Sequence, residues 1–125
     1  MDQFIKTNPN PINTNNNNKI IVEDQTLLLI VDVQQKLIKN IKDNQQLIFN
    51  IKKLIDTCNL LNVRVAITEQ NPLKLGKTLE TITDNNKYPK FEKMEFSCIK
   101  NKSFINYIND YNFKNIIVSL SLIHI

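Results

Sequence analysis

The sequence predicts an α/β domain built on a doubly wound parallel sheet with flanking helices. Short, continuous apolar runs such as residues 27–31 are typical of strands that are buried on both faces. Between these runs lie segments whose apolar residues recur every three or four positions, the spacing of an amphipathic helix. Strands that alternate with helices favour right-handed crossovers, and these produce a parallel sheet. A chain of 125 residues has room for one domain or part of one.

Residues 1–25 are predicted to be a disordered tail, and residues 26–125 to be the folded part. Residues 7–19 are rich in Asn and Pro and contain little that could be buried. The N-terminus lacks the basic start and apolar stretch of a signal peptide, and no apolar run approaches the roughly 20 residues of a membrane span. We therefore expect a cytoplasmic protein with no membrane partner.

The first strand is expected at residues 27–32, and a long helix at residues 44–61. The apolar side chains of this helix fall on one stripe, which predicts that it packs against the sheet. Cys58 lies on the stripe, so we interpret it as a small buried hydrophobic residue rather than a reactive thiol. The stripe consists of Leu47, Ile48, Ile51, Leu54, Ile55, Cys58 and Leu61.

The middle of the chain is expected to add two strands. Residues 63–68 form the second strand, and residues 71–77 form a loop that contains a proline and the chain's only glycine, Gly76. Residues 78–82 are predicted to be a short helical segment. After a polar turn, residues 89–93 are predicted to form the third, shorter strand.

The last predicted elements are a helix and the fourth strand. Ser103 is expected to cap the helix, which is expected to end at residues 112–115. The fourth strand is expected at residues 116–120, with the first strand between the second and the fourth. The predicted buried face of the helix consists of Phe104, Ile105, Ile108 and Tyr111.

Charge and cysteine content exclude several classes of function. The net charge of +4 comes from lysines along the whole length and a single arginine, which we interpret as a solvated surface and not as a nucleic-acid interface. The two cysteines, Cys58 and Cys98, are too few and too far apart for a disulfide framework, and neither has metal-ligand spacing. Reduced thiols are therefore expected.

Polar residues follow each predicted strand, and a parallel sheet would bring them to one edge. Asp32 ends the first strand, Glu69 and Gln70 follow the second, Lys93 ends the third, and His124 lies just beyond the fourth. In open α/β sheets the ligand crevice lies at this carboxyl edge. These five residues are therefore the candidate site.

Asp32 and Lys93 are the candidate catalytic residues. A carboxylate held close to an ammonium group can act as a general acid or base. We expect the two side chains to lie within roughly 6 Å of each other, the range in which opposite charges influence one another appreciably. The alternative is a structural ion pair across the strand ends.

Three segments also carry a resemblance to a known family. Residues 28–37, 68–78 and 91–98 resemble three successive motifs of the isochorismatase-like hydrolases, in the same order and at natural spacing. The second segment is similar to the Thr-Glu-Gln-x-Pro-x-x-Leu-Gly loop of one branch, the isochorismatase-domain proteins. The resemblance covers about residues 26–125.

The resemblance implies a Rossmann-like sheet and a triad of Asp, Lys and Cys that hydrolyses a small molecule. By motif, Asp32 and Lys93 match the first two members, and Gln34 lies beside the pocket. The family's nucleophilic cysteine follows a Gly-Ile-Glu-x-His-Val-Cys segment, whereas the sequence here ends with His124 and Ile125. The resemblance therefore implies that the domain is incomplete at its C-terminus, with about four strands present.

Two further departures from the family pattern bear on chemistry. Cys98 falls in a different motif, so it does not replace the nucleophile. Metal-binding relatives carry Asp-x-His after the second strand, where this chain has Gln70, Asn71 and Pro72. No metal or other cofactor is therefore expected.

Three hypotheses of function follow. The first is a truncated, inactive member of the family, a pseudoenzyme derived from a small-molecule hydrolase. The second is an active hydrolase that protonates a vinyl ether through Asp32 and Lys93 without a thiol. The third is a non-catalytic role, as a homo-oligomer or as the partner of a full-length paralogue. Because the fourth strand has an apolar, uncovered edge, we also expect the chain to associate.

Overall fold

A computed structural model describes residues 22–94 and 98–120 of the chain. Most of the predicted N-terminal tail and His124 lie outside the described residues. Within the described part, none of the helices combines the length and the apolar character needed to cross a membrane.

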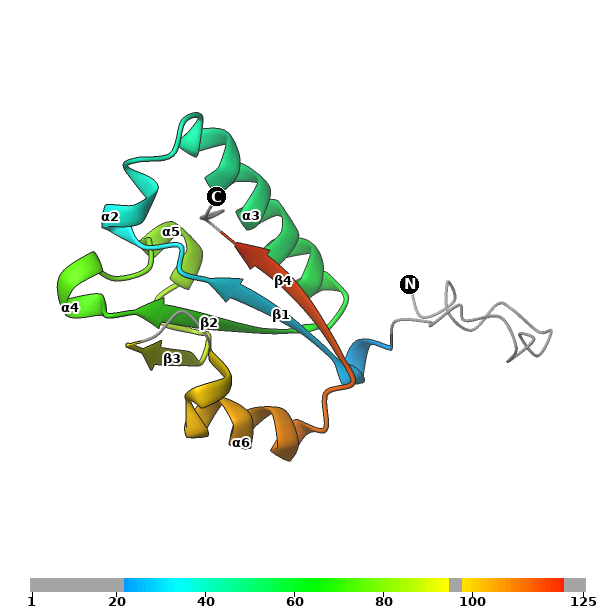
Figure 1. The fold of residues 1–125 in the computed structure, drawn as a ribbon. Coiled ribbons are helices and arrows are strands. Elements are labelled where there is room, and N and C mark those ends of the chain that lie inside the picture. The colour runs from blue at the N-terminus through cyan, green and yellow to red at the C-terminus, as the bar shows by residue number, and fades with distance from the viewer. Residues whose placement is uncertain (1–21, 95–97, 121–125) are drawn as a thin grey trace, which may run out of the picture.

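The described residues form one four-stranded sheet in the order β3-β2-β1-β4, in which every pair is parallel. The strands are β1 (Thr26–Val31), β2 (Arg64–Gln70), β3 (Lys90–Lys93) and β4 (Asn115–Leu120). All four arrowheads point to the same side of the molecule (Figure 1). The predicted α/β class, the strand positions and the placement of the first strand between the second and the fourth are confirmed.

Helices cover both faces of the sheet (Figure 1). On one face, α3 (Asn44–Leu60) and α5 (Glu80–Thr83) pack on a cluster that includes Leu28, Ile30 and Ile67. On the other face, α6 (Lys102–Tyr111) packs on Leu27, Leu29 and Ala66 through Phe104. Because β1 has a cluster on each side, its residues from Thr26 to Ile30 are almost completely buried. Each such aliphatic side chain contributes about 1.5–3 kcal/mol to folding.

The structure differs from the sequence predictions in the loops after β1 and β2. Residues 72–75, predicted to be loop, form a short helix, α4 (Pro72–Leu75), because Pro72 at its first position has the backbone angle that a helix start requires. A second short helix, α2 (Gln35–Ile38), was not predicted because one turn is too short to show a periodic pattern.

The predicted start and buried face of the last helix also need correction. Its cap is Asn101 and not Ser103, because the Asn101 side-chain oxygen accepts a hydrogen bond from the Phe104 N–H at 3.0 Å. Tyr111, predicted to be buried, is 44% exposed, whereas Tyr107 packs against the cluster on this face. With this face of the helix buried, Tyr107 lies beside Phe91 of β3.

Asparagine and aspartate take the left-handed backbone positions of this chain, which has one glycine. In the described ranges, eight residues other than glycine have positive φ, and all are Asn or Asp. Asn62 and Asn112 follow the ends of α3 and α6, where glycine is usual. These two residue types tolerate this conformation better than other non-glycine residues. Asp32 is one of the eight, so the same property shapes the candidate site.

Candidate active site

The carboxyl edge of the sheet brings together four of the five candidate residues. Asp32 follows β1, Glu69 and Gln70 end β2, and Lys93 ends β3. Parallel pairing sets Gln70 beside Lys93 and Thr68 beside Val31, so these strand ends are level with one another. The fifth candidate, His124, lies outside the described residues.

Asp32 and Lys93 form a buried ion pair. The Lys93 Nζ donates to Asp32 Oδ2 at 3.0 Å, which confirms the predicted proximity. Only 4% of the Lys93 side chain and 13% of the Asp32 side chain are exposed to solvent. Two charges withdrawn from water attract each other more strongly than a pair of charges at the surface. Removing either partner would be destabilising, because a buried charge without its counter-charge is costly.

Thr68 and the backbone fix the orientation of Asp32. The Thr68 hydroxyl donates to Asp32 Oδ1 at 3.0 Å, and the Asp32 N–H donates to the Thr68 carbonyl at 3.1 Å. Asp32 has φ 57, in the left-handed region, which costs an L-residue about 1 kcal/mol or more. Contacts to both carboxylate oxygens and to the backbone hold this strained residue in place.

Gln34 holds the loop that follows β2. Its side chain is fully buried, and its Nε2 donates to the carbonyls of Gln70 at 2.9 Å and Gly76 at 2.7 Å. Its Oε1 accepts from the Gln70 N–H at 2.8 Å. The amide group is therefore engaged with backbone at both ends of residues 70–76. The substrate-binding role implied for Gln34 and Gln70 stays a prediction.

Glu69 secures the end of the same loop. The Glu69 side chain is buried, and its Oε2 accepts hydrogen bonds from the Thr78 N–H at 2.6 Å and the Thr78 hydroxyl at 2.7 Å. Hydrogen bonds from two donors keep this carboxylate oriented toward the loop. The substrate-binding role predicted for Glu69 also stays a prediction, and its observed contacts are with the loop.

Gly76 is required where the loop passes over α2. Its φ is 83, and a Cβ atom at this position would lie 3.2 Å from Cβ and 3.3 Å from Oε1 of Gln35. Both the backbone angle and the close approach disfavour a side chain. The Gln35 N–H also donates to the Lys77 carbonyl at 3.0 Å, so α2 and the loop that contains α4 lie against each other.

Sequence reasoning missed the two threonines that complete these contacts. Thr68 and Thr78 are buried, and their hydroxyls bind the carboxylates of Asp32 and Glu69. The available signal was that Thr68 ends the apolar run from which the second strand was predicted. Its partner could not be identified without the strand register.

Both cysteines of the chain pack in or against the hydrophobic clusters on the faces of the sheet. Cys58 is 4% exposed within the cluster under α3, and burial raises the pKa of its thiol. Cys98, in η2 (Cys98–Lys100), packs against the cluster on the α6 face. Among the described residues, no three His, Cys, Asp or Glu side chains are grouped in a way that could hold a metal ion.

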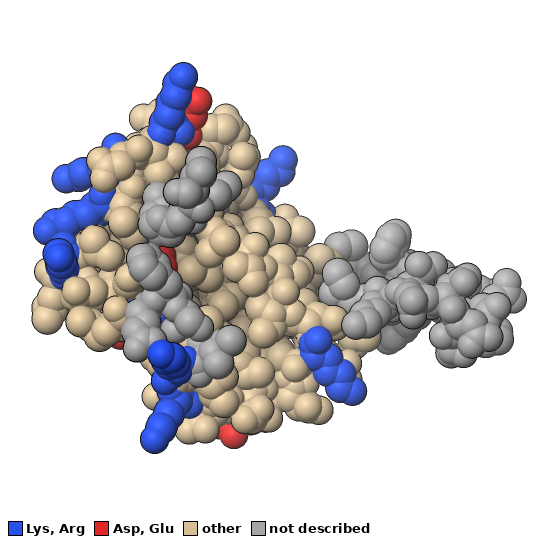
Figure 2. Space-filling view, in the orientation of Figure 1, with Lys and Arg blue, Asp and Glu red and all other residues tan. Residues whose placement is uncertain are grey.

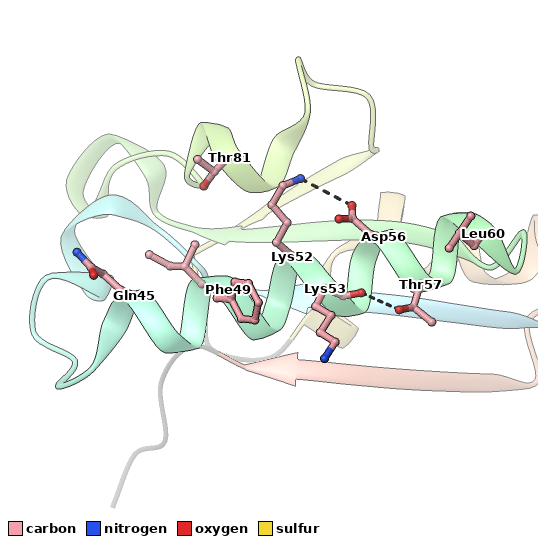
Figure 3. Close-up of a pocket in the computed structure, with 9 residues that line it drawn as sticks. Gln45, Phe49, Lys52, Lys53, Asp56, Thr57, Leu60 and Thr81 are labelled. Carbon is pink, nitrogen blue, oxygen red and sulfur yellow. Dashed lines mark hydrogen bonds and ion pairs between the residues drawn. The ribbon is translucent and has the colours of Figure 1, made fainter.

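The open groove in Figure 3 lies along α3 and contains none of the candidate residues. It has a volume of about 700 Å³. Its polar contacts are ordinary helix-surface contacts, namely an exposed Lys52–Asp56 pair at 3.7 Å and a hydrogen bond from the Thr57 hydroxyl to the Lys53 carbonyl. The candidate site is therefore the carboxyl edge and not this groove.

Comparison with known proteins identifies the family. The model of the isochorismatase domain matches residues 26–119. The chain belongs to the isochorismatase family. This is a family of hydrolases, and the matched residues include Asp32 and Lys93.

This chain aligns with about half the length of the proteins that it resembles. Isochorismatase family protein 1A of Dictyostelium discoideum is 32% identical over 100 residues, which cover 75% of this chain and 48% of the relative. The structure of MAR1 ribonuclease from Caenorhabditis elegans matches with a TM-score of 0.72 and 27% identity, over 82% of this chain and 53% of the other. An octameric hydrolase of unknown specificity from Escherichia coli, at 16% identity and a TM-score of 0.72, shares the fold. The chain therefore spans about half the length of these proteins.

We predict that Gln34→Met loosens the loop between β2 and α5. The substitution keeps the size of the side chain and removes three hydrogen bonds, so stability should fall by about 2 kcal/mol. The Gln70 amide should exchange with solvent faster, because it loses its acceptor. Hydrogen exchange followed by NMR measures both effects.

Gln46→Met is the matched control, because Gln46 is exposed on α3 and its side chain bonds only Asn50. It should leave exchange at residue 70 unchanged. Wild-type exchange in the Gln34→Met variant would show that Gln34 does not hold the loop.

Proposed function

We propose that this chain carries the acid/base half of a hydrolase site that acts on a small molecule. Asp32 is the acid/base group, and Lys93 stabilises its negative charge. The observation that supports this proposal is the buried 3.0 Å contact between the two side chains at the carboxyl edge of the sheet. Ligands of open α/β sheets bind at this edge.

The geometry of Asp32 suits proton transfer to and from a group above the sheet edge. Thr68 and Lys93 hold its two oxygens, so the carboxylate has a fixed direction. In a complete triad, Asp32 would take the thiol proton, the thiolate would attack the carbonyl carbon, and the proton would pass to the leaving group. The chain's own cysteines, Cys58 and Cys98, pack in the clusters on the two faces of the sheet. We therefore propose that the 125 residues alone do not perform thiol-dependent hydrolysis.

We predict no thiol-dependent turnover of an amide such as nicotinamide by the purified chain. In the same sample, iodoacetamide should label Cys98 in the native state and Cys58 only after unfolding. Burial both shields the Cys58 thiol and, by raising its pKa, lowers the fraction present as thiolate. Mass spectrometry measures the labelling.

Two results would change this proposal. Amide turnover that Cys98→Ser abolishes would contradict it. Isochorismate turnover that Asp32→Asn abolishes, and that Asp56→Asn on the surface of α3 does not, would establish the thiol-independent reaction instead. Sequencing the transcript beyond the codon for Ile125 would show whether a segment with the family's cysteine follows.

A second candidate function is RNA binding at the same edge, and it is favoured by the placement of lysines. Residues 33–42 and 70–79 contain five lysines and no acidic residue. All five are exposed, and Figure 2 shows blue side chains gathered on the side where α2 and α4 lie. These lysines, which we call the lysine rim, are Lys36, Lys39, Lys42, Lys74 and Lys77.

The lysine rim supports this candidate because folding concentrates charge that is scattered in the sequence. Backbone contact between Gln35 and Lys77 places the two segments side by side. Lysines on such a surface attract the phosphates of a nucleic acid. The related protein from Caenorhabditis elegans, which is named a ribonuclease, makes RNA the nucleic acid to test.

For this candidate function we predict that the chain binds a single-stranded RNA oligonucleotide. With about four phosphates neutralised, a fourfold rise in salt should weaken binding about fifty-fold. Replacing Lys36, Lys39, Lys74 and Lys77 by glutamine should abolish binding, as measured by fluorescence anisotropy. The same number of Lys→Gln changes at Lys52, Lys53, Lys87 and Lys114 is the control. Equal loss in both variants would show a general charge effect and no site at the lysine rim.

A further inference from the structure

A polar pocket lies at the amino edge of the sheet, at the opposite end of the strands from Asp32. It has a volume of about 440 Å³. Its walls come from η1 (Glu23–Gln25), from the start of β2, and from the C-terminal ends of α3 and α6, on the side away from the arrowheads in Figure 1. We call it the amino-edge pocket, and its lining residues are Asp24, Asn59, Asn62, Val63, Arg64 and Tyr111.

The amino-edge pocket does not depend on what pairs with the outer side of β4. All of its lining residues belong to the described part of the chain. Arg64 is the first residue of β2, and β1 lies between β2 and the edge strand β4. The pocket is therefore built by elements whose places in the sheet are already fixed.

Arg64, the only arginine of the chain, is held against aromatic rings. Its guanidinium carbon lies 4.1 Å from the centre of the Tyr111 ring. Tyr111 in turn packs on Tyr107, at 5.0 Å between ring centres, and on Phe113, at 5.7 Å. Cation–π attraction to a ring that is itself packed restricts where the guanidinium group can lie.

The N–H donors of Arg64 are available to a ligand. Within residues 22–94 and 98–120, its guanidinium group makes no hydrogen bond and no ion pair. Asp24 lines the same pocket, but it does not form an ion pair with Arg64. The planar fork of a guanidinium group matches a carboxylate, which can accept two parallel hydrogen bonds from it. A ligand that fits this side chain therefore carries a carboxylate.

The other polar groups of the pocket favour a positive charge. Asp24 supplies a carboxylate, and Asn59 keeps a side-chain oxygen as an acceptor, because its Nδ2 donates to the Tyr88 hydroxyl at 2.8 Å. Both α3 and α6 end at the pocket, and the C-terminal end of a helix carries partial negative charge. Neither helix has a basic residue in its last turn.

We propose that the amino-edge pocket binds a free α-amino acid. The carboxylate of the ligand pairs with the Arg64 guanidinium group, and its ammonium group pairs with Asp24 and the Asn59 side-chain oxygen. A simple anion fits less well because it would meet Asp24 and two helix C-termini, and a simple cation would meet Arg64. The pocket is remote from Asp32, so this inference is independent of the hydrolase proposal.

NMR titration of the full chain provides the first test, because a single arginine gives a single side-chain Nε–H signal. Each standard amino acid is added separately, and at least one should shift this signal until it saturates. The amide of that amino acid lacks the carboxylate, and its N-acetyl form lacks the ammonium group. Each derivative should bind at least about tenfold more weakly, because it loses a hydrogen bond between charged groups.

Two variants, measured by isothermal titration calorimetry, separate the charges of the pocket. Arg64→Gln should weaken binding of the amino acid at least about tenfold. Asp24→Asn should weaken it as well, but should not weaken binding of the N-acetyl form, which has no ammonium group. Lys114→Gln is the matched control and should bind as the wild type does. Lys114 is exposed at the same end of the sheet, where its N–H donates to the Gln25 carbonyl, but it does not line the pocket.

Several results would overturn the proposal. The absence of any shift in the Arg64 signal would do so, as would a derivative that binds as tightly as the free amino acid. Equal weakening by Lys114→Gln would show a general effect of charge and no site at Arg64. If Arg64→Gln lowers the thermal stability while the wild type binds no amino acid, Arg64 serves only to stabilise the end of α6.

Discussion

The buried contact between Asp32 and Lys93 is the constraint on which the carboxyl edge depends. It joins residues 61 positions apart and ties the short strand β3 to the centre of the sheet. Separating a buried pair of charges is costly, so this contact favours the arrangement in which β3 ends level with β2. The same contact fixes the direction of the Asp32 carboxylate, which is the property that an acid/base group needs.

The other buried polar groups extend this constraint from the strands to the loop above them. Gln34 bonds the backbone at both ends of residues 70–76, and Glu69 bonds Thr78 where that loop ends. Buried polar networks of this kind confer rigidity when every member is satisfied. In the described residues, no buried side-chain nitrogen or oxygen lacks a hydrogen-bond partner. The loop that carries α4 and part of the lysine rim is therefore held at a defined position beside Asp32.

Hydrophobic periodicity predicted the fold well, because the burial of apolar side chains determines the fold. The details of the site depend instead on tertiary contacts. The apolar runs of β1 and β2 and the stripe of α3 placed these elements correctly, and the shared sheet edge correctly paired Asp32 with Lys93. Thr68 and Thr78 were missed because a threonine gives no sign of which carboxylate it will bind. The cap of α6 was misplaced because Asn101 and Ser103 are both good caps, and only the contact with Phe104 distinguishes them. The lysine rim could not be seen because its members come from two segments that folding brings together.

A double-mutant cycle on Asp32 and Lys93 tests the central claim most directly. The free energy of unfolding is measured for the wild type, Asp32→Asn, Lys93→Met and the double variant. We predict a coupling free energy of about 2–3 kcal/mol, because each single change leaves one buried charge without its main partner. The exposed Lys52–Asp56 pair of α3, treated in the same way, should give no more than about 0.5 kcal/mol. Additive effects at Asp32 and Lys93, within about 0.5 kcal/mol, would contradict the account.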